Sequence, residues 1–368
     1  MTRVIALEVR TPLIDAPEVG HNRWHPDIPP IAQFEPGETV VLDMRDGLDG
    51  QITAETNDED VRALDMNRGH PLTGPFFVEG AAPGDLLEIE TLAIEPDGFG
   101  STIIIPGFGL LADRFPEPYV VKWTIEAGFA RSAELPGVAI PGAPFLGVVG
   151  VAPSHERLAH FTEREADLQR RGGFVLPPDA KSAVPGTGPA ATAGLRTVPP
   201  RETGGNMDIK QITVGSLLLL PVDCPGALVS LGDPHFAQGD GESCGVAIEM
   251  HARATVRFGL RKAGDLAWRP RYPAFEFTEL AGPPAGRRYL VTTGLPLDAE
   301  GRNEELDLNL AAKAALDEMV EYLTHVRGLT PSQAYILVSV AADLRVSEVV
   351  DVPNAIVSAH LPLDIFVD

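Results

Sequence analysis

The sequence predicts a mainly β protein of the α+β class, in which a sandwich-like β body is followed by a pair of helices. Short apolar runs joined by Gly/Pro turns recur at roughly ten-residue spacing in the first half, which indicates a sandwich or barrel rather than βαβ units. A long period-two alternation follows at 246–258, and helical spacing appears after residue 306. The 368 residues exceed the roughly 150 of one typical domain, so two lobes or one large β-rich body is expected.

The N-terminal part, predicted as residues 1–175, is rich in strands. The run Ser154-His155-Glu156 contains residue types of a catalytic triad, but three consecutive side chains point in different directions, so we expect no triad there. Three prolines exclude a helix at 21–30, which should be an extended loop from which His25 could reach a ligand. The strands predicted in this part lie at 3–10, 38–46, 86–94, 103–105 and 145–151.

A segment rich in Pro, Gly and Ala, residues 176–202, is predicted to be a long loop after a short charged stretch at 164–171. The loop leads to the polar clusters of the third part, residues 203–368. It could form a wall of a site there or be a plain surface connection, and its composition leaves both open. The two flanking parts could also be intertwined as one domain.

The third part begins with strands and ends with helices. At 246–258 apolar residues alternate with polar ones, so His251 is expected on the polar face of a half-buried strand and outside any catalytic group. The spacing predicts a helix over 306–326 that Gly328 ends. Thr330 and Gln333 form a predicted capping box for a second helix, which runs to about residue 342. Strand and turn should follow at 347–363.

Composition excludes several classes of partner. The chain has 29 Lys and Arg against 52 Asp and Glu, a net charge of −23, which disfavours nucleic acid and anionic membranes. No apolar run approaches the roughly 20 residues of a membrane span, and the N-terminus has no signal-peptide pattern. Two cysteines, Cys224 and Cys244, are the usage of a reducing compartment, so a cytoplasmic protein is expected. We also expect a homo-oligomer.

Two glycine-flanked polar clusters, 204–208 and 232–242, are the strongest candidates for a site. The second brings three carboxylates, one imidazole and one carboxamide into a short segment whose glycines allow close approach to a small ligand. This composition suits a divalent metal or a general acid/base pair. It also suits a surface hairpin of turn-forming residues, and the spacing alone does not decide between them.

These two clusters resemble the signature segments of the acetamidase/formamidase family. The segments 21–30, 72–85 and 333–366 are similar to the formamidase branch in particular. The resemblance covers nearly the whole chain. It implies a jelly-roll-like β body with an added mixed α/β portion, and hydrolysis of small carboxamides to the acid and ammonia without an organic cofactor.

Amide hydrolysis requires a nucleophile, a stabiliser for the oxyanion and a proton donor. The leading hypothesis is attack by water that a divalent ion, most simply Zn²⁺, or the carboxylates activate. Glu242 would act as general base and then acid. Asn206, Gln238 and His25 are the predicted substrate contacts. The predicted metal ligands are Asp208, Asp233, His235 and Asp240. Of these, Asp208, His235 and Asp240 are also predicted catalytic residues, together with Glu242.

Two alternatives stay open. In the first, Cys244 is the nucleophile, although a cysteine at the start of a strand is more simply a small buried residue. In the second, the protein is a non-catalytic β-sandwich that binds a polar small molecule or a metal through the same loops. The substrate could be a formamide- or acetamide-type amide or a larger or cyclic one such as a lactam.

Overall fold

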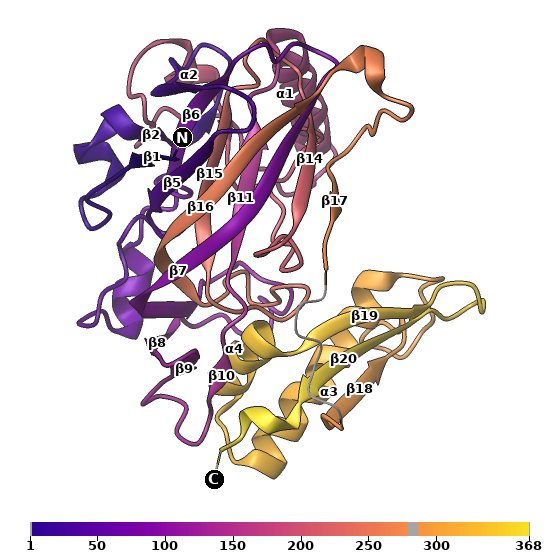
Figure 1. Cartoon of the computed structure of the whole chain (residues 1–368). Coiled ribbons are helices and arrows are strands. Elements are labelled where there is room, and N and C mark those ends of the chain that lie inside the picture. The colour runs from indigo at the N-terminus through magenta and orange to yellow at the C-terminus, as the bar shows by residue number, and fades with distance from the viewer. Residues whose placement is uncertain (1, 279–285, 368) are drawn as a thin grey trace.

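The computed structural model describes residues 2–278 and 286–367, arranged as a β body and a smaller C-terminal α/β unit (Figure 1). The predicted mainly β fold is confirmed. In the part of the chain that the structure describes, no helix is both long and apolar enough to cross a membrane.

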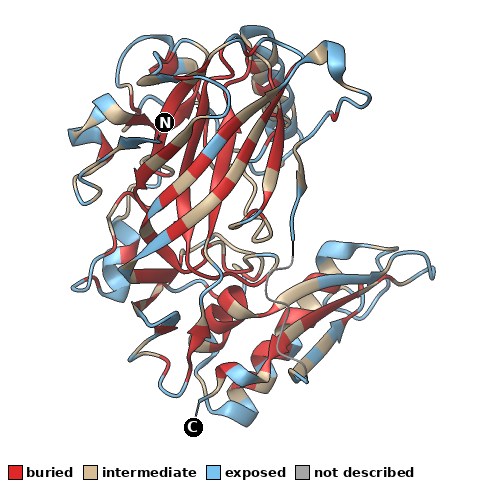
Figure 2. Ribbon diagram, in the orientation of Figure 1, coloured by how far each residue is buried: buried red, intermediate tan, exposed pale blue. Residues whose placement is uncertain are grey.

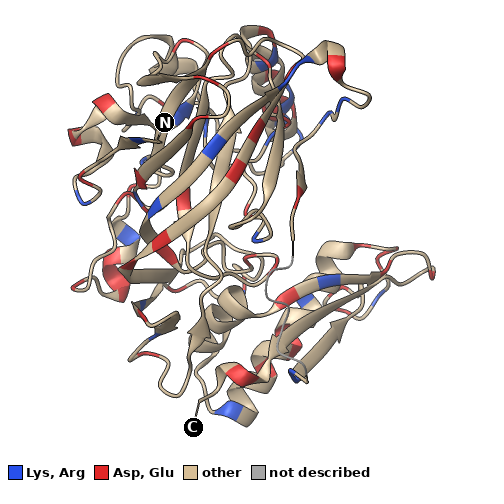
Figure 3. Ribbon diagram, viewed as in Figure 1, with Lys and Arg blue, Asp and Glu red and all other residues tan. Residues whose placement is uncertain are grey.

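One layer of the β body is organised around two long antiparallel strands, β7 (Leu86–Ile104) and β16 (Glu249–Arg261). These strands come from the two predicted parts of the chain. Figure 3 shows basic and acidic positions along these two long strands. Arg257 pairs with Glu90, and Arg261 pairs with Glu88, with all four side chains partly exposed. The other strands of the layer are β1 (Thr2–Ile5), β5 (Thr39–Met44), β8 (Tyr119–Glu126), β9 (Phe129–Arg131), β10 (Ile140–Pro141), β14 (Leu217–Pro221) and β17 (Ala274–Glu276).

The second layer has the fully buried strands β11 (Phe145–Val151) and β15 (Val229–His235) at its centre. Both strands are buried on both faces of the sheet, so their sequences are mostly continuous apolar runs rather than an alternation of apolar and polar residues. The layers join where His235 of β15 lies opposite Glu249 of β16. The remaining strands on this side are β2 (Gly20–His21), β4 (Ala32–Phe34), β6 (Leu72–Val78) and β13 (Gly204–Asn206), with β3 (Arg23–Trp24) and β12 (Leu195–Arg196) forming a small separate sheet.

The apolar residues between the layers form one continuous core that extends into the C-terminal unit (Figure 2). In that unit α3 (Leu308–Arg327) packs on α4 (Pro331–Ala341) and on a three-stranded sheet of β18 (Tyr289–Gly294), β19 (Asp343–Glu348) and β20 (Ile356–Pro362). Gly328, at φ 71°, ends α3, and the Thr330–Gln333 capping box starts α4, as the sequence predicts.

One helix escaped prediction. Residues His155–Arg170 form α1, where the sequence indicated only a short charged stretch. Ser154 is its N-cap and accepts a hydrogen bond from the backbone N–H of Arg157, which explains a Ser-His-Glu run without a triad. The predicted loop 176–202 contains a short helix, α2 (Gly188–Ala193). Short 3₁₀ segments lie at Leu13–Asp15, Pro17–Val19, Asp58–Ala63, Ala263–Asp265 and Leu363–Ile365.

Candidate active site

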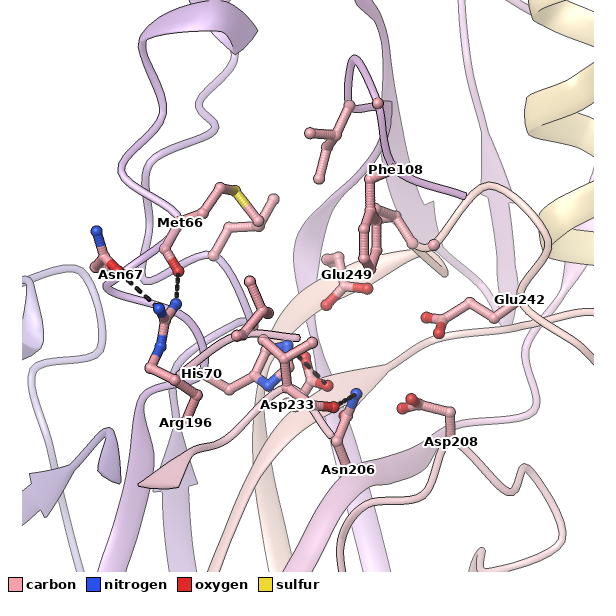
Figure 4. A pocket seen from close by; sticks show the side chains of 18 of the residues that line it. Met66, Asn67, His70, Phe108, Arg196, Asn206, Asp208, Asp233, Glu242 and Glu249 are labelled. Atoms are coloured by element: carbon pink, nitrogen blue, oxygen red, sulfur yellow. Dashed lines mark hydrogen bonds and ion pairs between the residues drawn. The ribbon is translucent and has the colours of Figure 1, made fainter. Parts of the chain in front are cut away.

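Polar side chains converge beside the middle of β11, where β13 and β15 flank this strand and β16 begins next to β15. Asn206 ends β13 and Asp208 follows it, Asp233 and His235 end β15, and Glu249 begins β16 (Figure 4). Because β11 pairs with both β13 and β15, the two polar clusters of the sequence lie on either side of one strand. Glu242 reaches the same place from the loop between β15 and β16.

Gly147 on β11 provides the space in which these groups meet. A Cβ atom at this position would lie 2.6 Å from Oδ1 of Asp208, 2.8 Å from Oδ2 of Asp233 and 2.9 Å from Cε1 of His235. A side chain at Gly47 would likewise overlap Asp233 and come within 3.0 Å of Oε2 of Glu249. The carboxylates therefore occupy volume that two glycines leave free.

Three of the carboxylates sit on backbone in the left-handed region. The φ angles are 50° at Asp208, 56° at Asp233 and 42° at Glu242. Such conformations are uncommon for residues with a side chain and cost roughly 1–3 kcal/mol each, and they cluster at functional sites where the surrounding structure holds them. The three strained backbone positions are therefore consistent with a functional site, where the positions of the carboxylates matter more than local backbone stability.

His235 is the centre of the cluster and is fully buried. Its Nε2 lies 3.1 Å from Oε1 of Glu249 and 3.4 Å from Oδ2 of Asp233. Its Nδ1 lies 3.2 Å from Oε1 of Gln238, whose amide nitrogen donates to the backbone carbonyl of Asp208. Since that Gln238 oxygen can only accept, Nδ1 carries a proton and donates it, and Nε2 faces the carboxylates.

Burial and mutual charge separate the pKa values of this cluster. Burial raises the pKa of Asp208 to about 7 and that of Glu249 to about 8, although His235 opposes both shifts. Burial and then the charge of Asp208 raise the pKa of Glu242 well above its usual value. Groups with such shifted pKa values in a cavity are typical of catalytic sites.

Two groups shift toward their charged forms despite burial. The charges of Glu249 and Asp233 outweigh desolvation and raise the pKa of His235 well above 6.5. Desolvation is likewise outweighed at Asp233, where the charges of His70 and His235 lower the pKa. His70 itself shows the opposite balance, because its burial lowers its pKa more than Asp233 raises it. Asp233 and His235 thus form the ionised pair of the site.

The donor set fits a divalent cation. Ligand atoms of Asp208, His235 and Glu242 lie within 4.8 Å of one another, and so do those of Asp233, His235 and Glu249. Oδ1 of Asp208 and Oε2 of Glu249 are buried without a hydrogen-bond partner among the described residues. Four carboxylates beside one imidazolium, two of them on buried residues and two on half-buried ones, require compensation by protons or by a cation. One imidazole with carboxylates is a ligand type that Zn²⁺ accepts.

The cluster lines one end of a cavity of about 570 Å³. Asn206 and His70 also reach this cavity, and Oδ1 of Asn206 and Nδ1 of His70 have no hydrogen-bond partner among the described residues. Leu176, Arg196 and Val198 line it too, so the Pro/Gly/Ala-rich loop forms a wall of the site. Of the two roles that the sequence left open for this loop, the structure shows the wall.

Three predicted site residues lie elsewhere. Asp240 does not line the cavity: its carboxylate is 3.5 Å from Nζ of Lys210, and its backbone N–H donates to Asp343. We correct its assignment as a ligand shared with Asp208, because a charged lysine on the protein surface already balances it. Gln238 orients His235 rather than facing the cavity.

His25 is also remote from the cavity. It packs edge-on against His155, with a ring-centroid separation of 5.6 Å, and its Nδ1 accepts the backbone N–H of Asp27. His21 is buried nearby, where its Nε2 lies 2.7 Å from the hydroxyl of Ser230. His251 contacts Asp46 and stays outside the cavity, as its place in the alternation predicted.

Glu249 and His70 are the site residues that sequence reasoning missed. Glu249 is the first residue of β16, and the alternation assigned it to a solvated face together with His251. It is buried because the layers close over this end of the strand, where it opposes His235. His70 follows a turn between 3₁₀ and strand segments and carries no motif. The signal available in the sequence was the position of Glu249, which follows the polar cluster 232–242 by seven residues at the start of a predicted strand and so lies close to that cluster.

Cys244 is a structural residue. Its Sγ lies 3.5 Å from the carbonyl oxygen of Ile103 and 3.4 Å from that of Val246, and the residue is fully buried. Burial raises the pKa of its thiol to about 12. It does not line the cavity, so the thiolate that a covalent route needs is disfavoured.

A cluster of carboxylates and one imidazole with shifted pKa values at the end of a cavity is typical of the catalytic site of an enzyme. The model of the Acetamidase/Formamidase family matches residues 6–368. The chain is similar to the formamidase of Methylophilus methylotrophus, with 36% identity over 94% of this chain and 89% of that protein, and to the acetamidase of Mycolicibacterium smegmatis, with 38% identity over 86% and 84%. The chain belongs to the acetamidase/formamidase family, whose members are amidohydrolases acting on amide C–N bonds.

Solved structures agree with this assignment. The chain resembles the γ-lactamase from Delftia acidovorans with a TM-score of 0.93 and 36% identity, over 100% of this chain and 93% of that one. It resembles the acetamidase from Bacillus halodurans with a TM-score of 0.56 and 28% identity, over 95% and 97%. The family resemblance inferred from the two polar clusters is confirmed, and the alternative of a non-catalytic binding protein is set aside.

Proposed function

We propose that the protein hydrolyses small carboxamides, linear or cyclic, to the carboxylic acid and ammonia or an amine, with water activated inside the Asp208–Asp233–His235–Glu242–Glu249 cluster. The observation that carries the proposal is the position of this cluster. The four carboxylates of the cluster line one end of a cavity that is otherwise largely apolar, and His235 lies behind them in contact with Asp233 and Glu249. The pKa values of these groups are shifted in different directions. Acid and base partners for one reaction are therefore available within a few ångströms.

We assign Asp208, His235 and Glu242 as the residues that would hold a divalent cation, with one position open toward the cavity. Bound there, such an ion would polarise the amide carbonyl and lower the pKa of water to roughly 7. Gln238 supports the assignment, because it accepts the Nδ1 proton of His235, so Nε2 is the nitrogen that would coordinate the cation after giving up its own proton. Asp233, held ionised by His70 and His235, adds negative charge behind the ligands.

Glu249 is the general base of the proposed reaction. Its Oε1 accepts the backbone N–H of Ala247, which fixes the carboxylate, while its Oε2 has no hydrogen-bond partner among the described residues, and the residue lines the cavity. Oε2 takes a proton from water as the oxygen attacks the carbonyl carbon. The same carboxyl then gives this proton to the nitrogen as the C–N bond breaks, which releases the acid and the amine. Glu249 takes the role that the sequence suggested for Glu242.

Asn206 orients the amide. Its Nδ2 donates to the carbonyl oxygen of Val198, so its Oδ1 faces the cavity and can accept an N–H of the substrate. A carboxamide offers two such protons and a lactam offers one. The contact therefore suits both substrate types and disfavours esters, which have none.

The test is release of acid and amine from a panel of formamide, acetamide and a γ-lactam, with enzyme treated with chelator and then resupplied with Zn²⁺. We expect activity that chelation removes, that Zn²⁺ restores and that Glu249→Gln abolishes. Cys244→Ala should retain turnover, because its thiol is outside the cavity. Full activity in chelated, metal-free enzyme would overturn the metal assignment, and loss of turnover in Cys244→Ala with retained fold would favour the covalent route.

A further inference from the structure

The cavity above the cluster is apolar. Beyond the carboxylates its walls are formed by side chains from several segments far apart in the sequence, and Phe108 and Met66 lie on opposite sides of the site (Figure 4). A substrate whose amide reaches Asn206 and Glu249 places its acyl group against these walls. The apolar lining includes Leu48, Met66, Ile105, Phe108, Leu176 and Val246.

The size of the cavity exceeds what the smallest amides need. Its volume of about 570 Å³ falls in the range of about 300–1,000 Å³ that pockets for drug-sized ligands occupy. Formamide and acetamide have three and four non-hydrogen atoms and would leave most of this apolar space to water. Burial of apolar surface stabilises binding by roughly 25 cal/mol per Å², so the smallest amides forgo most of the available binding energy.

The charges around the cavity exclude an ionised acyl group. Arg196 is the one Lys or Arg among the described lining residues, and its terminal nitrogens donate to Oδ1 of Asn67 and the carbonyl oxygen of Met66. The guanidinium is therefore engaged with the protein. Asp208, Glu242 and Glu249 at the opposite end repel a second carboxylate.

We propose that the preferred substrates are neutral carboxamides or lactams with an apolar acyl part larger than acetyl, such as a branched, aromatic or ring-fused group. This inference rests on the proposed function. Phe174 is the specificity residue that the structure adds. It lines the cavity from the 176–202 loop's N-terminal flank, yet its side chain is 76% exposed, so a bound apolar acyl group would cover a ring that is otherwise in water.

The experiment measures kcat/KM for formamide, acetamide, butyramide, isobutyramide, benzamide and a γ-lactam. From acetamide to butyramide, we expect kcat/KM to rise roughly fourfold per added methylene group, the factor that burial of one CH₂ gives. Phe174→Ala should lower kcat/KM for benzamide roughly tenfold and leave formamide within a factor of about two. Because Phe174 is exposed, this variant should fold normally. Phe277→Ala, another exposed phenylalanine that does not line the cavity, is the matched control.

A second variant reverses the size preference. Leu176→Trp narrows the cavity from the same loop, and we expect it to lower kcat/KM for benzamide and the lactam while formamide hydrolysis persists. Equal or higher kcat/KM for formamide than for every larger amide, with no effect of Phe174→Ala, would overturn this inference and leave the proposed function intact. Hydrolysis of no amide by the Zn²⁺-supplied enzyme would instead remove the proposed function on which it rests.

Discussion

Nε2 of His235 lies 3.1 Å from Oε1 of Glu249, and these two residues are also the register pair that joins strands β15 and β16. The contact that links the two layers of the body is therefore a contact inside the site. Both side chains are at least 95% buried, so the pair cannot be replaced by water without opening the layers. A change in the pairing of β15 with β16 would therefore also change the distance between the His235 and Glu249 side chains.

Glu249→Gln keeps the shape of the side chain and removes its charge and basicity. We expect kcat to fall at least a hundredfold, the scale on which a general base contributes, with KM little changed. Steady-state kinetics on the best amide of the panel checks this. Glu90→Gln is the control: Glu90 lies on β7, where it pairs with Arg257 at the surface, and its variant should retain full activity. A Glu249→Gln enzyme with normal kcat would exclude Glu249 as the base.

The fold was predictable where one local rule decides an element. Gly328 and the Thr330 capping box mark the ends of α3 and α4 in the sequence, and the structure follows them. Helix α1 was missed because it has few apolar residues: Leu158 and Phe161 are its buried residues, and the rest of the helix is mostly polar. A helix that buries only two apolar side chains has too few apolar residues to be recognised from its sequence.

The site was predictable only in part, for a related reason. Asp208, Asp233, His235 and Glu242 stand in glycine-rich clusters, and the structure brings them together around Gly147. Asp240 shares the same cluster, but the chain turns at Gly241, which has a φ of 106°, so the side chain of Asp240 meets Lys210 while Glu242 reaches the cavity. Local composition indicates that a loop is functional, whereas the direction of each side chain depends on distant strands.

Removal of metal tests the ligand assignment. Dialysis against a chelator should remove activity and lower the melting temperature, because the four clustered carboxylates lose their compensating charge. Asp208→Asn should fail to retain Zn²⁺ in elemental analysis. Asp240→Asn should bind Zn²⁺ like the wild type, since its carboxylate faces Lys210. Loss of metal in Asp240→Asn but not in Asp208→Asn would contradict the structure.

The pH dependence of stability follows from the raised pKa values. The folded pKa of Asp208 is about 7 and that of Glu249 about 8, against usual values of 3.8 and 4.5. Groups whose pKa is raised by folding stabilise the protein fully below their usual pKa, and this contribution is lost as the pH rises through the folded pKa. His235, whose pKa is also raised, acts in the same direction.

Metal-free protein should therefore unfold more easily at about pH 9 than at about pH 6, by several kcal/mol in the free energy of unfolding. Urea denaturation at the two pH values measures the difference. Added Zn²⁺ should reverse it, because a bound cation replaces the protons and holds the carboxylates ionised. An unfolding free energy of the metal-free protein that rises between these pH values would mean that the cluster is not desolvated as the structure indicates.

Helix α4 holds the loop that carries Glu242. The hydroxyl of Ser339 accepts the backbone N–H of Cys244 at 3.0 Å and donates to the carbonyl oxygen of Val246 at 2.9 Å, and the hydroxyl of Tyr335 donates to the carbonyl oxygen of Ser243. Ser339→Ala should lower kcat about tenfold by loosening Glu242, and Ser339→Thr should recover part of it. Ser332→Ala, at the exposed start of the same helix, controls for a general effect on α4. Equal kcat in the two alanine variants would show that the loop needs no such support.

Gly147→Ala tests whether the cluster depends on the space at β11. The added methyl group would lie 2.6 Å from Oδ1 of Asp208 and 2.8 Å from Oδ2 of Asp233, closer than real Cβ contacts, while its other neighbour is the His235 ring. Because the fully buried strand cannot move away, we expect the carboxylates to separate and both Zn²⁺ retention and activity to be lost. Gly264→Ala, where a Cβ meets no atom within 4 Å, should change neither. A Gly147→Ala enzyme that binds Zn²⁺ and turns over amide normally would place the reacting groups somewhere other than around this glycine.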